Sequence, residues 1–295
     1  MKIENVLICI PAFNEEKTLG RVLSEIDGVI SKTNYKFKVM VYNDGSSDNT
    51  ARIAEEHGAI VFSHKRNLGL AVTFRDELRE ALKLNADVIV HTDADGQYRA
   101  EGIPRLLKRI EEGYDLVLGS RFQGKLDGMT WTKRLGNRMF ARVISGLIKT
   151  KLTDTTTGFR AFTREVAESI EIINSFTYTQ EQIIKAAKQG FAICEVPVDT
   201  RKTRKSRLFS SPLQYAIKAW INILRIYRDF DPIKFFGSLG AIFVFAGAVL
   251  GTLIIARILM LGGAGGTPRV ILTALLVFTG IQIIIFGFLA DMLRK

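Results

Sequence analysis

The stretch Val88-Ile-Val-His-Thr-Asp-Ala-Asp-Gly-Gln97 joins an apolar run to two carboxylates that lie one residue apart. The run is typical of a strand buried on both faces, and the ends of such strands in open α/β sheets face a ligand crevice. Alternate side chains of an extended segment point the same way, so Asp93 and Asp95 can face one cation, with the Gln97 amide as a third oxygen. These ligands suit Mg²⁺ or Mn²⁺. The alternative is a polar loop whose carboxylates only cap the next helix.

Strand and helix patterns alternate on both sides of this stretch, with short connections between them. The alternation predicts an α/β fold with a mostly parallel central sheet and helices on both faces. In such a sheet Pro11 to Glu15, Asp44, the Asp93–Asp95 pair and Arg121 all follow strand ends and can share one crevice. The expected strands are 6–10, 37–42, 60–62, 88–90 and 116–118, and the expected helices are 15–30, with Asn14 as its cap, 71–84 and 103–111.

Two apolar stretches near the C-terminus predict a transmembrane hairpin. Residues 235–256 and 270–290 contain no charge, and each is long enough for a helix to cross a ~30 Å hydrocarbon layer. A glycine-rich turn, 262–268, connects them. Within the first helix Gly247-Ala-Val-Leu-Gly251 permits close packing, which could bring protomers together as a homo-oligomer. Basic residues are more numerous at the open end of the hairpin, so the N-terminal region and the C-terminus are expected in the cytoplasm.

An amphipathic pattern precedes the hairpin at residues 212–230. Trp220 and Tyr227 fall on its apolar side and Lys218 and Arg225 on its polar side, which is typical of a helix lying in the headgroup plane. The alternative is a helix packed on the preceding domain. The expected organisation is a first domain at 1–210, an interfacial helix region at 211–234 and the hairpin at 235–295.

The composition excludes several classes of protein. The net charge of +11 could indicate nucleic-acid binding, but the basic excess is concentrated beside the hairpin, where anionic lipid or a phosphate is the more natural partner. No zinc spacing, P-loop or dinucleotide glycine fingerprint is present. Cys9 and Cys194 both lie in apolar strand-like runs and are expected to be free thiols in a reducing compartment.

Seven short motifs follow one another along residues 5–210. They are Pro11-Ala-Phe-Asn-Glu15, Asp44-Gly-Ser-Ser-Asp48, Asn67-Leu-Gly69, Asp93-Ala-Asp95-Gly-Gln97, Gly119-Ser-Arg121, Asp154-Thr-Thr-Thr-Gly-Phe-Arg160 and Glu195-Val-Pro197. In this order they resemble glycosyltransferase family 2, and within it the branch of dolichyl-phosphate mannose synthases and polyprenyl-phosphate hexosyltransferases. The hairpin is similar to the two-helix anchor of the polyprenyl-phosphate glucosyltransferase type. The resemblance implies a GT-A-type fold.

The resemblance also implies roles for single residues. Pro11, Phe13, Glu15 and Asp44 would contact the nucleoside of a nucleotide-sugar donor, Asp93, Asp95 and Gln97 would hold Mg²⁺ or Mn²⁺ on its diphosphate, and Arg121 would lie by the phosphates. Two departures from the family pattern could alter which nucleotide is accepted. Asn43 stands where the family usually has an aspartate, and Val72-Thr-Phe74 replaces the usual small residues.

The resemblance implies transfer of a hexose from a GDP-mannose or UDP-glucose type donor to a membrane polyprenyl (dolichyl) phosphate, and the residue chemistry is compatible with it. A cation and arginines can stabilise the leaving diphosphate. The acceptor phosphate is already ionised near neutral pH, so no general base is needed, and direct attack would invert the anomeric carbon. Asp95, Arg121 and Arg134 are the expected catalytic residues. The candidates for holding the acceptor phosphate are Arg121, Arg134, Arg138, Arg201, Arg204 and Arg207. The alternative is that these arginines only form a solvated basic surface.

Two other functions stay open at this point. A processive polysaccharide synthase, or another membrane enzyme of the family, shares the core motifs, although it normally has more membrane helices and a Gln-x-x-Arg-Trp motif that is absent here. A membrane-tethered nucleotide-binding protein without catalysis is disfavoured because the metal trio and the arginines are all present.

Overall fold

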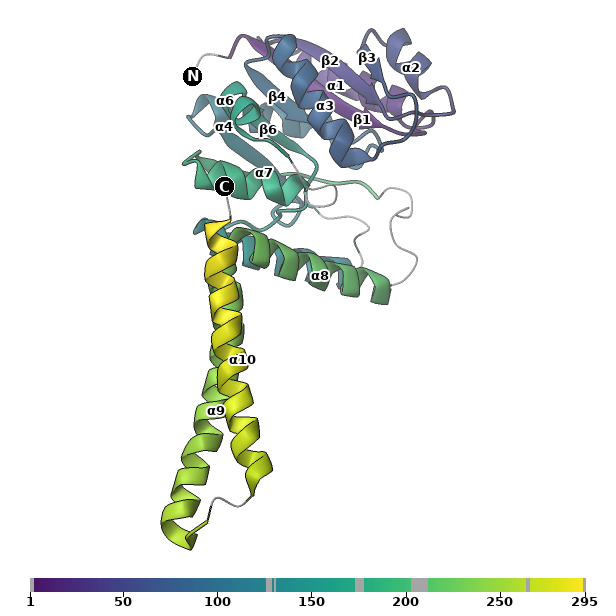
Figure 1. The fold of residues 1–295 in the computed structure, drawn as a ribbon. Coiled ribbons are helices and arrows are strands. Elements are labelled where there is room, and N and C mark those ends of the chain that lie inside the picture. The colour runs from purple at the N-terminus through teal and green to yellow at the C-terminus, as the bar shows by residue number, and fades with distance from the viewer. Residues whose placement is uncertain are drawn as a thin grey trace. The chain divides into compact units, whose positions relative to one another are not determined.

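A computed structural model describes residues 3–125, 129, 131–172, 178–202, 212–263 and 266–293. These residues form two compact units, Met1–Ile217 and Lys218–Lys295. The first unit contains the sheet and the helices that cover it (Figure 1). The second contains the C-terminal helices. The organisation into three regions expected from the sequence stays a prediction.

The first unit is built on a seven-stranded sheet with the order β3-β2-β1-β4-β6-β5-β7. Every pairing is parallel except the two made by β6, which runs antiparallel to both β4 and β5. The mostly parallel sheet is therefore confirmed. The strands are β1 (Asn5–Ala12), β2 (Lys36–Asn43), β3 (Ile60–Ser63), β4 (Val88–His91), β5 (Leu116–Ser120), β6 (Arg160–Thr163) and β7 (Ile193–Pro197).

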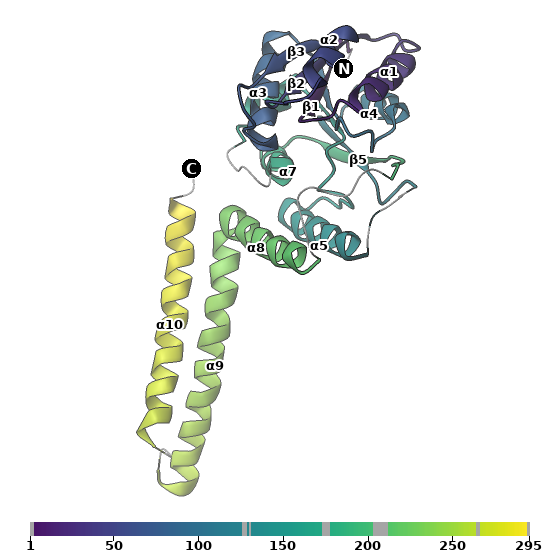
Figure 2. The same ribbon diagram turned by 90° about the vertical axis from the view of Figure 1, so that its right-hand side faces the viewer.

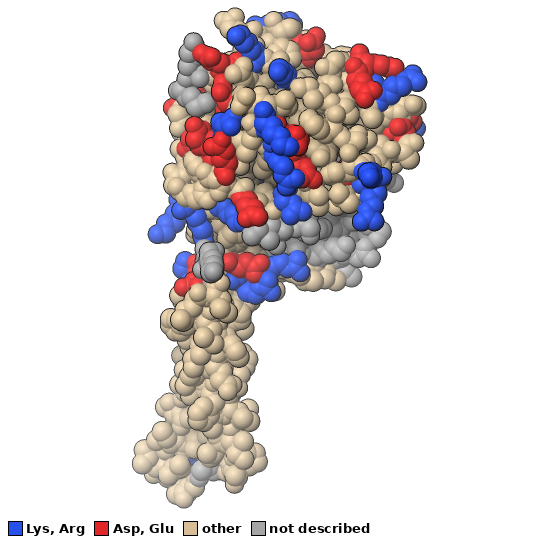
Figure 3. Space-filling model, turned by 45° about the horizontal axis from the view of Figure 1, so that its top comes forward, with Lys and Arg blue, Asp and Glu red and all other residues tan. Residues whose placement is uncertain are grey.

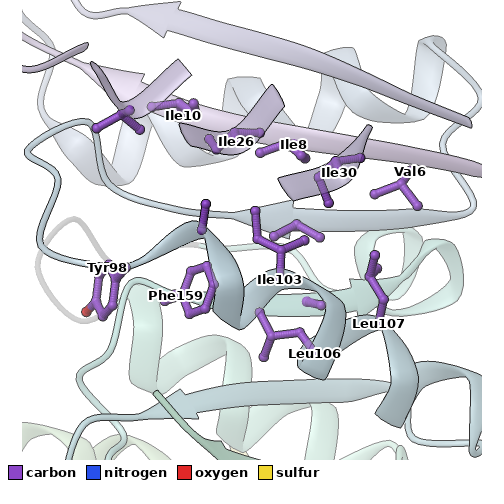
Figure 4. Packing of buried hydrophobic residues seen from close by; sticks show 14 of the residues in the cluster. Val6, Ile8, Ile10, Ile26, Ile30, Tyr98, Ile103, Leu106, Leu107 and Phe159 are labelled. Atoms are coloured by element: carbon purple, nitrogen blue, oxygen red, sulfur yellow. The ribbon is translucent and has the colours of Figure 1, made fainter. Parts of the chain in front are cut away.

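Helices lie on both faces of the sheet. Side chains of β1 and β4 that alternate along each strand, such as Ile8, Ile10 and Val90, pack with α1 and α4 on one face (Figure 4). On the other face Phe74 of α3 packs against Phe162 of β6. The helices of this unit are α1 (Leu19–Ile30), α2 (Thr50–Glu56), α3 (Leu70–Lys83), α4 (Ile103–Glu111), preceded by the 3₁₀ turn Ala100–Gly102, α5 (Trp131–Ile148), α6 (Arg164–Ser169) and α7 (Tyr178–Lys188).

The expected cap of the first helix is wrong. α1 begins at Leu19, and Asn14 adopts a left-handed backbone conformation with φ of 54°. Its side chain is already engaged, because Asn14 Oδ1 accepts a hydrogen bond from the backbone N–H of Ser47. Asn14 therefore ties the β1–α1 loop to the β2–α2 loop at the edge where both strands end.

The second unit contains two helices long and apolar enough to cross a membrane, α9 (Pro232–Leu261) and α10 (Thr267–Met292). They run side by side as an antiparallel hairpin (Figure 2). The face of the hairpin seen in Figure 3 carries hardly any charged side chain along its length. The predicted two-helix hairpin is confirmed. α8 (Pro212–Phe230), which covers the predicted interfacial helix, lies across the boundary between the two units.

Glycines set the packing inside the hairpin. A Cβ on Gly240 would lie 2.5 Å from the carbonyl oxygen of Gly280, and one on Gly247 would lie 2.7 Å from Val277. The helices therefore approach closely at these glycines, where a side chain would not fit. Gly247 is buried against α10 of the same chain, so the expectation that Gly247 and Gly251 pack against another protomer loses this support.

Candidate active site

The ends of β1, β2, β4 and β5 lie at one edge of the sheet because these strands are mutually parallel. β6 runs the opposite way, so its first residue, Arg160, lies at the same edge, opposite His91 of β4. The loop before β6 is thereby brought to the edge where the Asp93–Asp95 segment leaves the sheet. The motifs expected to share a crevice are gathered at one end of the molecule's first unit.

The two aspartates after β4 differ in their surroundings. Asp95 Oδ1 accepts a hydrogen bond of 2.9 Å from the backbone N–H of Gln97. The half-buried carboxylate of Asp93 makes no hydrogen bond or ion pair with a residue that the structure describes. Burial, reinforced by the negative charge of Asp95, raises the pKa of Asp93 to about 6.

This arrangement fits a divalent cation. Two neighbouring carboxylates, one of them without a hydrogen bond, repel each other until a positive charge lies between them. The described residues hold no cluster of three or more His, Cys, Asp or Glu with metal-binding geometry, so further ligands would be Gln97, water or a substrate phosphate. The backbone at Gly158 packs directly against the carboxylate of Asp93, since a Cβ there would lie 2.8 Å from both Asp93 carboxylate oxygens.

The segment that follows β7 fixes the position of the Asp93–Gln97 segment. The backbone N–H of Arg201 donates to the carbonyl of Gln97, and Tyr98 forms an isolated bridge with Thr200. Arg201 Nη1 contacts both carboxylate oxygens of Glu25 on α1, at 2.6 and 2.8 Å. Arg201, one of the candidates for the acceptor phosphate, is therefore engaged in a salt bridge.

The expected nucleoside residues lie at the ends of β1 and β2. Pro11 is buried, Phe13 is 37% exposed, and the buried Glu15 accepts a hydrogen bond from Thr18 at 2.9 Å. The carboxylate of Asp44 is fully engaged within the protein. It accepts backbone hydrogen bonds from Leu68 (2.9 Å) and Gly69 (2.8 Å) and so fixes the loop between β3 and α3.

The sequence predicted no role for His64. Its Nδ1 lies 2.7 Å from Asp44 Oδ1 and its Nε2 lies 3.0 Å from Asp76 Oδ2, while its ring packs 4.8 Å from that of Tyr42. Burial disfavours the charged imidazolium, but the hydrogen bonds and charges of the two aspartates outweigh burial and raise the pKa of His64. His64 thus positions Asp44, and a lone histidine in the sequence carried no sign of it.

The two departures from the family pattern lie in different surroundings. Asn43 accepts a hydrogen bond from the N–H of Ser46 and donates one to Ser63, so it stabilises the loop after β2. Phe74 is buried against His91 and Tyr178, with both ring centroids 4.9 Å away. Phe74 therefore belongs to the packing between α3, β4 and α7.

Arg121 forms a buried ion pair with Asp154 and also hydrogen-bonds to Thr156, both in the Asp154–Arg160 motif. Its guanidinium contacts Asp154 and donates to Thr156 at 2.7 Å. Burial opposes the charge, but Tyr98 and Asp154 raise the pKa of Arg121. Glu195 accepts hydrogen bonds from the backbone N–H groups of Thr153 and Asp154 and so holds the loop that carries Asp154. Asp154 and Glu195 belong to the motifs that resemble the family, but the sequence predicted no role for either residue.

The other arginines expected to hold the acceptor phosphate lie outside the strand ends. Arg134 and Arg138 are exposed on α5, and the guanidinium carbon of Arg138 lies 5.9 Å from the centre of the Phe122 ring, next to Arg121. The same helix exposes Trp131 and Leu135, at 75% and 53%. Arg204 and Arg207 lie outside the described residues.

A family model for glycosyl transferase family 2 matches residues 7–171, more than half of the chain. The chain belongs to glycosyltransferase family 2. This family-2 chain is 36% identical over 202 residues to a dolichyl-phosphate hexose transferase of Haloferax volcanii, which covers 68% of this chain and 84% of that protein. It is 26% identical to a polyprenol monophosphomannose synthase of Mycolicibacterium smegmatis, over 66% of this chain and 77% of that one.

Solved structures share the fold of the family-2 chain. Mannosyl-3-phosphoglycerate synthase from Rubrobacter xylanophilus matches with a TM-score of 0.63 and 20% identity, over 76% of this chain and 74% of that one. Glucosyl-3-phosphoglycerate synthase from Mycobacterium tuberculosis, in complex with Mn²⁺ and UDP-glucose, matches with a TM-score of 0.59 and 20% identity, over 76% and 78%. The predicted family, the branch and the GT-A-type fold are confirmed, and the chain is a glycosyltransferase with membrane-spanning helices.

Proposed function

We propose that this protein transfers a hexose from a nucleotide-sugar to a polyprenyl phosphate, with inversion at the anomeric carbon. The observation that carries the proposal is the pair Asp93 and Asp95 after β4, in which the carboxylate of Asp93 has no hydrogen bond to a described residue and a raised pKa. The polyprenyl acceptor is supported by the names of the two curated relatives and by the hairpin. The donor is of the GDP-mannose or UDP-glucose type.

The donor end uses the loops after β1 and β2. Phe13 and Glu15 contact the nucleoside, and Asp44 acts mainly through the Leu68–Gly69 backbone that it fixes. Asp93 and Asp95, with Gln97, would hold Mg²⁺ or Mn²⁺, which supplies positive charge to the departing diphosphate when bound. Arg121 adds a fixed positive charge beside them, since its charge interacts with that of Asp93.

The acceptor needs orientation more than activation. Its phosphate oxygen is ionised at neutral pH, so no protein base has to remove a proton before attack. Arg134 and Arg138 on α5 contact this phosphate, together with Arg204 and Arg207. The exposed Trp131 and Leu135 on the same helix favour a position at the headgroup level, where aromatic and aliphatic side chains insert between lipids.

The membrane orientation follows from charge. Arg225 and Arg228 precede α9 and Lys234 lies in its first turn, against Arg257 and Arg269 near the turn of the hairpin. The positive-inside rule then places the first unit on the cytoplasmic side, where nucleotide-sugars are made. The catalytic domain corresponds to residues 1–210, the interfacial region to 211–234 and the anchor to 235–295.

Transfer of labelled sugar to lipid tests the proposal. Membranes containing the protein are incubated with radiolabelled GDP-mannose, UDP-glucose and UDP-N-acetylglucosamine, with Mg²⁺ or Mn²⁺ or with a chelator, and the organic phase is counted. Label is expected with one donor, only with the cation and only when the polyprenol carries a phosphate. Asp95→Ala should abolish it, whereas Glu56→Ala, which removes an exposed ion pair with Arg52, should not.

Three results would contradict the proposal. Label in an insoluble polymer would favour a processive synthase, and absence of label with every donor would favour a nucleotide-binding protein without catalysis. A product that retains the donor's anomeric configuration would exclude direct displacement by the phosphate.

A further inference from the structure

The second transmembrane helix, α10, has two faces of different chemistry. Gly280 and Gly287 form the inner face, because a Cβ on Gly280 would lie 2.6 Å from Val244 and one on Gly287 would lie 2.9 Å from Phe236 of α9. Gln282 is two residues beyond Gly280, which is about 200° around a helix. Its side chain is exposed, so it lies on the outer face of the hairpin.

Gln282 lies near the middle of the membrane-spanning length. The 21 residues 270–290 carry no charge and lie between Arg269 and Asp291. At about 1.5 Å per residue they span roughly 32 Å, close to the thickness of the hydrocarbon layer. The centre of this stretch is residue 280, so Gln282 is about 3 Å from the midplane. Neither water nor lipid headgroups reach that depth.

The amide of Gln282 has no partner among the described residues. The hydroxyl groups of Thr252 and Thr273 in the same hairpin each donate to the backbone carbonyl four residues earlier, at 2.9 Å. A glutamine amide has two donors and an acceptor, and leaving them unpaired in hydrocarbon costs several kcal/mol. α9 and α10 contain no other amide side chain, and no described residue of the hairpin hydrogen-bonds to Gln282.

We propose that this face of α10 is an interface with α10 of a second copy of the chain, in which the two Gln282 amides hydrogen-bond to each other. An amide carries both donor and acceptor, so two copies of one residue are complementary. Both copies are inserted in the same direction, which places the two Gln282 side chains at one depth. Exposed apolar residues continue the face at alternating spacings of three and four, the repeat of paired helices: Ile271, Leu275, Phe278, Ile285 and Leu289.

Crosslinking in liposomes tests this interface independently of transferase activity. In a background with Cys9→Ala and Cys194→Ala, the full chain carrying Phe278→Cys or Ile285→Cys should form disulfide-linked dimers. Leu253→Cys, at a position on α9 that is 61% exposed, is the matched control and should not. Dimers from Leu253→Cys as abundant as those from the α10 positions would overturn the proposal.

Changing the amide then tests the role of Gln282 itself. Gln282→Leu, which keeps the size of the side chain, should weaken dimerisation about tenfold in dissociation constant, in line with interhelical hydrogen bonds of roughly 1–2 kcal/mol. Gln282→Asn keeps an amide and should lose less. A monomeric unmodified chain in liposomes, or equal crosslinking of Phe278→Cys with and without Gln282→Leu, would refute the proposal.

Discussion

The guanidinium of Arg121 and the carboxylate of Asp154 form a two-point ion pair, with Nε 2.6 Å from Oδ2 and Nη2 2.8 Å from Oδ1. Both side chains are buried, at 7% and 0% exposure. A charge pair of this kind fixes direction as well as distance, because the planar guanidinium matches the two carboxylate oxygens. Arg121 is therefore presented to the strand edge in one orientation.

Asp154→Asn should destabilise the protein strongly. The substitution keeps the size of the side chain but leaves the Arg121 charge buried without its partner, which typically costs about 3–5 kcal/mol. Denaturant unfolding of the purified chain measures this cost, and sugar transfer should be lost with it. Glu56→Gln, which removes an exposed pair with Arg52, is the control and should have little effect. An Asp154→Asn protein of unchanged stability would contradict the importance of the pair.

The contribution of His64 to stability should decline with rising pH. Its folded-state pKa lies above its ordinary value of 6.5 because it contacts Asp44 and Asp76. The stabilisation is therefore fully present below about pH 6.5 and is lost as the pH rises through the folded-state pKa. Unfolding free energies between pH 6 and 9 should show this decline in the unmodified chain. His64→Gln should flatten it, and a decline of equal size in that variant would assign the effect to other groups.

Asp93→Asn should abolish transfer and stabilise the protein when no cation is present. The folded-state pKa of about 6 lies above the ordinary 3.8, so the contribution of Asp93 is favourable below about pH 4 and is lost as the pH rises through 6. At pH 7.5 with a chelator the ionised Asp93 destabilises the fold, and the neutral amide removes this cost, by up to about 3 kcal/mol. Thermal unfolding measures the gain. A lower melting temperature for Asp93→Asn would show that its charge is compensated within the protein.

Gly158→Ala should impair transfer by displacing Asp93. The added methyl group would lie 2.8 Å from both carboxylate oxygens, closer than such contacts allow. Transfer should fall at least tenfold, with a weaker response to added Mn²⁺. Gly146→Ala is a suitable comparison, because that exposed glycine of α5 has no atom within 4 Å of the new methyl group and alanine favours a helix. Equal activity of the two variants would contradict the crowding at Asp93.

The sequence predicted the first five strands because their apolar runs and intervening helices follow a strong period. Val88 to His91 is buried along its whole length, as a strand covered on both faces requires. β6 was not foreseen. It has only four residues and follows a polar loop, and its antiparallel direction depends on pairing with β4 and β5, which no local pattern encodes.

Site residues that follow strand ends were predicted from the sequence. Site residues that act through contacts with distant parts of the chain were missed. Asp93 and Asp95 follow a buried strand and were found. His64 and Asp154 act through contacts with Asp44 and Arg121, which are 20 and 33 residues away in the chain. The incorrect cap at Asn14 has the same cause, since its side chain is bound by a loop 33 residues away.

The connection between β5 and β6 has a consequence for the evolution of substrate specificity in such an enzyme. The two strands are antiparallel neighbours, which a turn of two residues could join, yet residues 121–159 run between them and include α5. The sheet itself does not require this excursion, and lengthening such a connection costs little entropy. If the proposed function holds, new acceptors could be acquired by replacing the part of this connection around α5, while Arg121, Asp154 and Gly158 at its two ends stay with the donor half of the enzyme.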